Sequence, residues 1–216
     1  MNKFKLIAGL LLAATAATTQ AAGIIGSLAL VPSVAQTLNF ENENGLIVNG
    51  GSYAFGSGSL SSTLQYTVGQ NNADLGENGL WGGNGNHFLS FDNVGDMTLN
   101  VIFAQATSGF AFDFSAWQEL GSMTPAEVSI SYYDAANSLI GAHTEAINSS
   151  LGLNSYNSYL TTGYLSDSAN IARVSITGDG VVLDNLTYSV PEPGTPALIG
   201  LALGVMGLMS RRRRTV

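Results

Sequence analysis

The sequence predicts an all-β protein, a sandwich of about eight to ten short strands. Short stretches that alternate apolar with small or polar residues follow one another along the chain, and Gly- and Asn-rich turns separate them. The composition agrees, because 26 glycines and only 10% charged residues favour strands and turns over long helices. A chain of 216 residues has room for one such domain between two targeting segments.

The strands are expected between residues 37 and 190, and turn-forming residues separate one strand from the next. The alternating pattern places them at Thr37–Glu41, Leu60–Val68, His87–Phe91, Met97–Phe103, Gly109–Ser115, Ala126–Asp134, Ala172–Gly178 and Val181–Val190. A weak helical candidate lies at Ser115–Leu120, and the Gly-rich stretch 69–86 is expected to be a long loop or flap. No linker interrupts residues 36–189, so we expect one β-sandwich domain there.

Residues 1–35 have the features of a secretory signal peptide. Two lysines supply the early positive charge, and the apolar stretch Leu6–Ala14 follows them. Small residues offer two cleavage sites, one near residues 21–22 and one at Ala35, and the pattern does not choose between them. We therefore expect the general secretion machinery to export the protein.

The last segment, residues 190–216, contains three elements in order. The triplet Pro191, Glu192, Pro193 comes first, the apolar stretch Pro196–Met209 follows, and a basic cluster comes last: Arg211, Arg212, Arg213 and Arg214. As a helix the apolar stretch would cover roughly 21 Å, less than the hydrocarbon core of about 30 Å. It has no polar face, however, and arginines can extend it by snorkelling. These features favour one transmembrane helix with its basic tail inside the cell.

This ending resembles a PEP-CTERM sorting signal, which is found on exported proteins of Gram-negative bacteria that make exopolysaccharide. The resemblance implies that an exosortase, a membrane-embedded processing enzyme, recognises the triplet and cleaves near it. The helix would then anchor only an inner-membrane intermediate, and the mature protein would reach the cell surface or the extracellular medium. The two prolines suit recognition, because they keep the backbone extended and without helix hydrogen bonds.

The phrases "FDFS", "VSISYYDAANSLIG" and "VVLDNLTYSV" resemble the bodies of many PEP-CTERM proteins, whose domains are jelly rolls related to carbohydrate-binding modules. In such modules the first and last strands lie side by side. Glu41 ends the first expected strand and Asp184 lies in the last, so the pair would share one structural calcium ion, which prefers oxygen ligands. The alternative is that Asp184 caps a turn and Glu41 is solvated.

Charge and missing residue types exclude several classes of function. The body from Gln36 to Val190 has fourteen acidic residues against Arg173 alone, a net charge near −13 that repels nucleic acid and anionic lipid. The chain has no cysteine, which removes disulfides and thiol catalysis. His87 and His143 have no motif around them, and no serine lies in a nucleophile elbow. We therefore expect a protein that is not an enzyme.

One aromatic residue is a candidate ligand platform. Trp81 lies in the Gly-rich stretch, where it is either a loop anchor or a surface on which a sugar ring stacks. We expect a non-catalytic cell-surface or extracellular-matrix protein, associated with exopolysaccharide or biofilm. A carbohydrate-binding module is the alternative, and a secreted glycan-active enzyme is the least favoured one.

Overall fold

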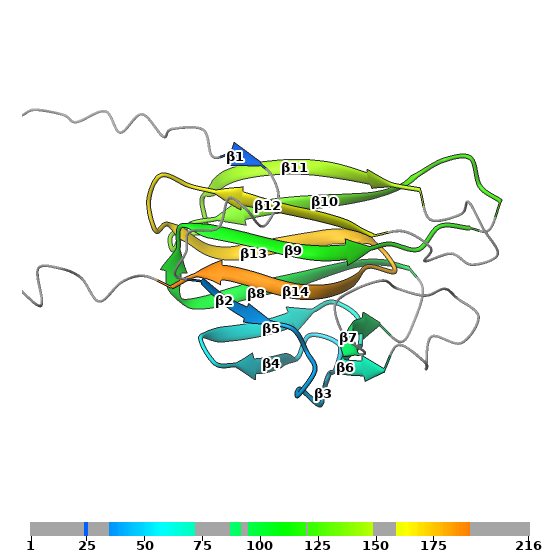
Figure 1. Ribbon diagram of the computed structural model, residues 1–216, viewed down its shortest axis with the longest axis horizontal. Coiled ribbons are helices and arrows are strands. Elements are labelled where there is room, and N and C mark those ends of the chain that lie inside the picture. The colour runs from blue at the N-terminus through cyan, green and yellow to red at the C-terminus, as the bar shows by residue number, and fades with distance from the viewer. Residues whose placement is uncertain are drawn as a thin grey trace, which may run out of the picture.

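The protein is an antiparallel β-sandwich of two sheets that pack face to face (Figure 1). The structure is a computed structural model, and it describes residues 24–25, 35–71, 87–91, 95–119, 121–148 and 159–190. Within these residues the chain forms fourteen strands, eight in one sheet and six in the other. The expected all-β, jelly-roll-like sandwich is therefore confirmed.

The larger sheet has the strand order β1-β12-β9-β14-β7-β6-β3, and β2 also pairs with β14. Its strands are β1 (Ile24–Ile25), β2 (Ala35–Leu38), β3 (Gly45–Ile47), β6 (Tyr66–Asn71), β7 (His87–Phe91), β9 (Gly109–Ser115), β12 (Leu160–Leu165) and β14 (Val182–Ser189). The central strand β14 is paired along both edges, with β9 on one side and with β2 and β7 on the other. Three other strands of this sheet therefore pair directly with β14.

The smaller sheet has the strand order β11-β10-β13-β8-β5-β4. Its strands are β4 (Ser52–Phe55), β5 (Gly58–Ser62), β8 (Asp96–Thr107), β10 (Ala126–Tyr133), β11 (Leu139–Ile147) and β13 (Ile171–Asp179). Along β8, β10 and β13 buried residues alternate with more exposed ones, as expected of strands with one face on the core.

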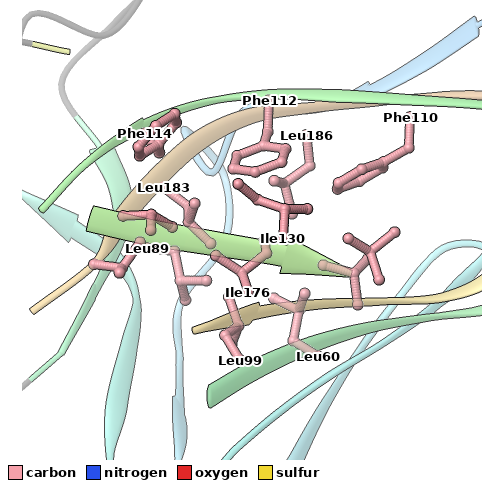
Figure 2. Close-up of a cluster of buried hydrophobic side chains, with 14 of the residues drawn as sticks. Leu60, Leu89, Leu99, Phe110, Phe112, Phe114, Ile130, Ile176, Leu183 and Leu186 are labelled. Atoms are coloured by element: carbon pink, nitrogen blue, oxygen red, sulfur yellow. The ribbon is translucent and has the colours of Figure 1, made fainter. Parts of the chain in front are cut away.

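The core lies between the two sheets, and β9 contributes three of its large aromatic side chains. Phe110, Phe112 and Phe114 alternate along this strand and are completely buried. Figure 2 shows their rings on the side of the core opposite Ile130 and Ile176 of the smaller sheet. Burial of a side chain of this size stabilises the fold by about 1.5–3 kcal/mol, so these residues dominate the packing.

Arg173, the only basic residue between residues 36 and 190, is held on the outer side of the smaller sheet. Its guanidinium carbon lies 3.9 Å from the ring centroid of Tyr133. It also donates hydrogen bonds to the side-chain oxygens of Asn100 at 3.0 Å and of Asn137 at 2.6 Å. The cation–π contact and the two hydrogen bonds fix the side chain against its own sheet.

The sandwich has two different ends. At one end the first residue of β2 pairs with the last residue of β14, Ala35 with Ser189, so the chain leaves toward both termini from one place. At the other end β9 finishes at Ser115, and β13 finishes at Asp179. We call these ends the terminal pole and the distal pole; the tip of β14 and the tip of β9 mark them at opposite sides of Figure 1.

Several expected strands have the bounds that the pattern predicted, and the differences have physical causes. Strands β7 and β9 match their expected ranges. The expected strand Leu60–Val68 is instead β5 and β6, because residues 63–65 form a bend between them. Strand β11 was not expected, since its partly buried positions hold Gly141, His143 and Glu145 and so lack an apolar alternation.

The weak helical candidate at Ser115–Leu120 is wrong. Ser115 ends β9, and residues 116–119 form no regular element. In the part of the chain that the structure describes, no helix has the length and hydrophobicity needed to cross a membrane. The expected transmembrane stretch 196–209 lies outside the described residues, as does most of the expected signal peptide.

We predict that the exported protein keeps Ile24 and Ile25. These residues form β1 and pair with Leu165 and Tyr164 at the edge of β12, so cleavage at Ala35 would remove this cover of the edge strand. Cleavage near residues 21–22 would retain it. Intact mass and N-terminal sequencing of the exported protein measure the cut, and a mature chain that begins at Gln36 would contradict the prediction.

Candidate functional site

The first strand of the body lies beside the last one, as the jelly-roll resemblance implied. β2 pairs antiparallel with β14, and Leu38 is the partner of Leu186. The expected first strand Thr37–Glu41 is instead β2, which ends at Leu38, and Glu41 lies in the turn that follows it. Its carboxylate is still close enough to Asp184 to raise the pKa of that group. The two residues expected to share calcium are therefore in the same region of the larger sheet.

The backbone is strained next to both of these carboxylates. Among the residues that the structure describes, three non-glycine residues have a positive φ, and two of them are Phe40 (58°) and Asn185 (51°), the direct neighbours of Glu41 and Asp184. The pairing of β14 with β9 shifts register between Asp184 and Thr187, so Asn185 belongs to a bulge. Left-handed conformations of this kind are costly, and they concentrate where a side chain must be aimed at a ligand.

Two carboxylates act on the buried carboxyl group of Asp184 in this region. Asp113 of β9 is the direct partner of Asp184 on β14, so both side chains lie on the same face of the sheet. Burial raises the pKa of Asp184 to about 7, against the pull of the Asn185 N–H, and the Asp113 and Glu41 carboxylates add to the rise. The sandwich therefore holds a buried carboxyl group whose charge a nearby cation would stabilise.

The carboxylates of Glu41 and Asp113 already accept hydrogen bonds from other groups of the protein. Glu41 accepts from the backbone N–H of His87 at 3.0 Å and lies 3.2 Å from its Nδ1. Asp113 accepts from the Thr161 hydroxyl and from the Asn185 side-chain amide, the latter at 2.8 Å. Among the described residues, no group of three or more His, Asp or Glu side chains is close enough to hold a metal ion.

A second candidate site, a cleft at the distal pole, was not predicted from the sequence. Its volume is about 550 Å³, and its walls come from the loop after β9, the start of β10 and the end of β13. The lining residues are Trp117, Gln118, Glu119, Ser122, Thr124, Pro125, Ala126, Glu127 and Asp179. A half-buried tryptophan, an amide and three carboxylates therefore surround one space of the size that a small ligand needs.

Hydrogen bonds brace the wall of this cleft. The backbone N–H of Trp117 donates to the carbonyl of Asp179 at 3.0 Å, which ties the loop to the end of β13. The Gln118 side-chain amide donates to the carbonyls of Ser122 and Thr124, at 3.4 and 2.5 Å. Asp179 in turn accepts from the backbone N–H of Gly95 at 2.8 Å. The loop is irregular in secondary structure but held by internal contacts, so the cleft is largely preformed.

The stretch "SAWQEL", which contains Trp117, predicts a weak helix from the spacing of its apolar residues. The glycine and proline in "GSMTP", directly after it, indicate the loop that the structure has. Trp81, the predicted ligand platform, lies outside the described residues. The triplet Pro191, Glu192, Pro193 and the arginines 211–214 also lie outside them.

A hydroxyl, an imidazole and a carboxylate meet between β11 and β12. The Thr162 hydroxyl lies 3.0 Å from His143 Nε2 and donates to Glu145 Oε1 at 2.7 Å. A hydrolytic triad requires the nucleophile and the acid on opposite ring nitrogens. Here Glu145 approaches the same Nε2, at 3.6 Å, and Nδ1 is buried without a partner. Burial also lowers the pKa of His143 despite Glu145, which favours the neutral imidazole, and the arrangement lacks the geometry of a triad.

Residues 189–214 match the family description "PEP-CTERM protein-sorting motif". The expected sorting triplet and the four arginines lie inside this match, which confirms the resemblance that the ending carries. A motif of this kind implies exosortase processing, export and a membrane-anchored sorting intermediate. No curated protein is significantly similar to the chain.

Solved structures with a similar arrangement of strands include adhesin and carbohydrate-binding domains. The K2 cleaved adhesin domain of Lys-gingipain has a TM-score of 0.42 and 10% identity, covering 72% of this chain and 99% of that one. The CBM22-1–GH10 modules of Clostridium thermocellum xylanase 10B have a TM-score of 0.40 and 15% identity, and the match covers 74% of this chain and 29% of that one. A non-crystalline-cellulose-specific module, CBM28, has a TM-score of 0.36 and 16% identity, and the match covers 50% of this chain and 76% of that one.

We predict that Asp184→Asn removes a pH dependence of stability in chelator-treated protein. The folded-state pKa of about 7 lies above the ordinary 3.8, so the folded protein binds this proton more tightly than the unfolded one does. Stability contributed by the group is therefore lost as pH rises from about 4 to about 7. Melting temperatures at pH 5 and pH 8 should differ by several degrees more in the wild type than in the variant.

Asp167→Asn is the matched control, because Asp167 is exposed in the loop between β12 and β13. It should leave the wild-type pH profile unchanged. Parallel pH profiles for the wild type and Asp184→Asn would show that Asp184 titrates normally in the folded protein.

Proposed function

We propose that the mature protein is a non-catalytic cell-surface module that binds neutral or amino-bearing polysaccharide in the cleft at the distal pole. The observation that carries this proposal is the position of Trp117 at a preformed polar cleft of about 550 Å³. The exosortase-sorting motif supports a surface location, and association with extracellular polysaccharide or biofilm is part of the proposal.

The chemistry of the cleft suits a sugar ring. An indole ring offers a flat apolar surface on which the C–H face of a sugar can stack. Hydroxyl and carboxylate groups beside it can form hydrogen bonds with the ring hydroxyls. Thr124, Glu127 and Asp179 line the same space as Trp117, so both kinds of contact are available to one ligand.

The charge of the cleft selects among polysaccharides. Glu119, Glu127 and Asp179 contribute three carboxylates, and the body as a whole has fourteen acidic residues against one arginine. That arginine, Arg173, is bound to Tyr133 and two asparagines on the outer side of the smaller sheet. A uronic-acid or sulfated chain would be repelled, whereas a neutral or amino-bearing chain would be accepted.

The placement of the cleft suits a surface protein. The chain leaves toward the sorting motif at the terminal pole, whereas the cleft lies at the distal pole, near the start of β14. An eight-residue strand such as β14 separates the two ends by about 25 Å. While the protein is held by its C-terminal end, the cleft would therefore face away from the membrane.

Calcium remains a second proposal, for the carboxylates near β14. The raised pKa of Asp184, the proximity of Asp113 and Glu41, and the left-handed residues beside them support a cation there. Asp184 and Glu41 would be the side-chain ligands, with the remaining oxygens supplied by backbone and water, as calcium accepts. Such an ion would join the first and last strands and contribute stability rather than chemistry.

We predict that Trp117→Ala weakens binding of a neutral polysaccharide by roughly tenfold or more, because the stacking surface is lost. Affinity electrophoresis in gels containing galactomannan, hydroxyethylcellulose, chitosan or alginate measures the effect. Wild-type protein should be retarded by at least one neutral or amino-bearing polymer and not by alginate.

Met123→Ala is the control, since Met123 is 89% exposed in the same loop but does not line the cleft. It should bind as the wild type does. Retardation by alginate alone, or equal retardation of wild type and Trp117→Ala, would contradict the proposed ligand site.

We also predict that calcium raises the melting temperature of the wild type at pH 8 by a few degrees, because an ion that binds only the folded state stabilises it. Asp184→Asn and Glu41→Gln should lose this shift, whereas Asp167→Asn should keep it. Differential scanning fluorimetry with calcium or chelator measures the shift, and equal responses of all four proteins would remove the proposed site.

A further inference from the structure

A small apolar pocket lies at the terminal pole, away from the cleft described above. Its volume is about 250 Å³. The lining residues are Ser57, Phe103, Ala104, Gln105, Tyr188, Ser189 and Val190. Phe103 and Tyr188 are almost fully buried, with ring centroids 5.3 Å apart, and they give the pocket its apolar wall. The cavity is large enough for one apolar side chain of a partner.

The wall of this pocket is held rigidly. The Tyr188 hydroxyl donates to Gln36 Oε1 at 2.9 Å and lies 3.2 Å from the Ser57 hydroxyl, which also bonds to Gln36 at 3.0 Å. The ring of Phe55 meets that of Tyr188 edge-on at 6.1 Å. A preformed apolar pocket with a polar rim is the kind of surface that anchors a partner's side chain at low entropic cost.

The pocket is continuous with the sorting motif. The matched motif covers residues 189–214, and its first two residues, Ser189 and Val190, also line the pocket. Ser189 is fixed in the fold, because it pairs with Ala35 and its carbonyl accepts from the Thr107 hydroxyl at 2.7 Å. The motif therefore begins inside the last strand, with no spacer between the folded body and the triplet.

Short reach then brings the processing enzyme close to the body. Pro193 is three residues beyond Val190, so even a fully extended chain holds it within about 10 Å of the pocket. An enzyme that binds the triplet at this distance therefore lies beside the terminal pole and can contact the pocket.

We propose that the exosortase recognises the folded body as well as the motif, by placing an apolar side chain in the pocket lined by Phe103, Ala104 and Tyr188. Gln105 and Ser57 at the rim offer the hydrogen bonds that would orient it. The pocket acts as a docking site that positions the triplet for cleavage, and it lies on the side of the molecule from which the motif leaves.

The test is the rate at which the full-length precursor is converted to mature protein in its host, followed by pulse-chase and immunoblot. Ala104→Trp fills the pocket from an exposed position and should slow conversion about fivefold or more. Ala146→Trp is the matched control, an equally exposed alanine on β11 near the distal pole, and it should be converted at the wild-type rate. Equal melting temperatures of the purified bodies exclude misfolding.

A second variant leaves the pocket intact and separates it from the motif. Six Gly/Ser residues inserted between Val190 and Pro191 should also slow conversion, and Ala104→Trp should then have little further effect, because docking no longer positions the triplet. Wild-type conversion of Ala104→Trp and of the insertion, while Glu192→Ala blocks conversion, would overturn the docking site. Unchanged conversion of Glu192→Ala would instead overturn motif-directed processing and the docking site with it.

Discussion

Strand β14 is hydrogen-bonded along both edges, and the other features of the molecule depend on this pairing. All eight of its residues are buried, with β9 on one side and β2 and β7 on the other. The Glu41 carboxylate, in the turn after β2, lies near Asp184, and the β9 register brings Asp113 opposite it. The strand starts beside the cleft and ends in the sorting motif. One strand thus connects the proposed ligand site, the carboxylate cluster and the processing signal.

The two ends of the sandwich are built by different physical means. The terminal pole is made of paired strands and packed aromatic rings, with Tyr188 fixed by Phe55, Phe103 and a hydroxyl network. The distal pole is made of a loop held by backbone and amide hydrogen bonds, with Gln118 as its brace. Rigid strands suit an end that must present a motif in one orientation. A braced loop suits an end that presents a preformed ligand site.

The sequence predicted the fold well and the sites unevenly, for identifiable reasons. Strands β7 and β9 were predicted with correct bounds, because apolar alternation along them is strong. Strand β11 was missed because His143 and Glu145 occupy its inward positions. The sorting triplet could be predicted because its residues are contiguous in the chain. The cleft at Trp117 could not be predicted, because it joins residues from the loop after β9, the start of β10 and the end of β13.

The contacts of Arg173 have a consequence for the resistance of the body to proteolysis. Trypsin-like proteases cut after lysine or arginine in a segment that can be drawn out into their active site. Arg173 is the only such residue between positions 36 and 190, and it sits in a strand paired on both sides, beneath Tyr133 and bonded to two asparagines. An enzyme of that specificity therefore meets a body with a single cleavable bond, and opening it requires β13 to leave the centre of its sheet.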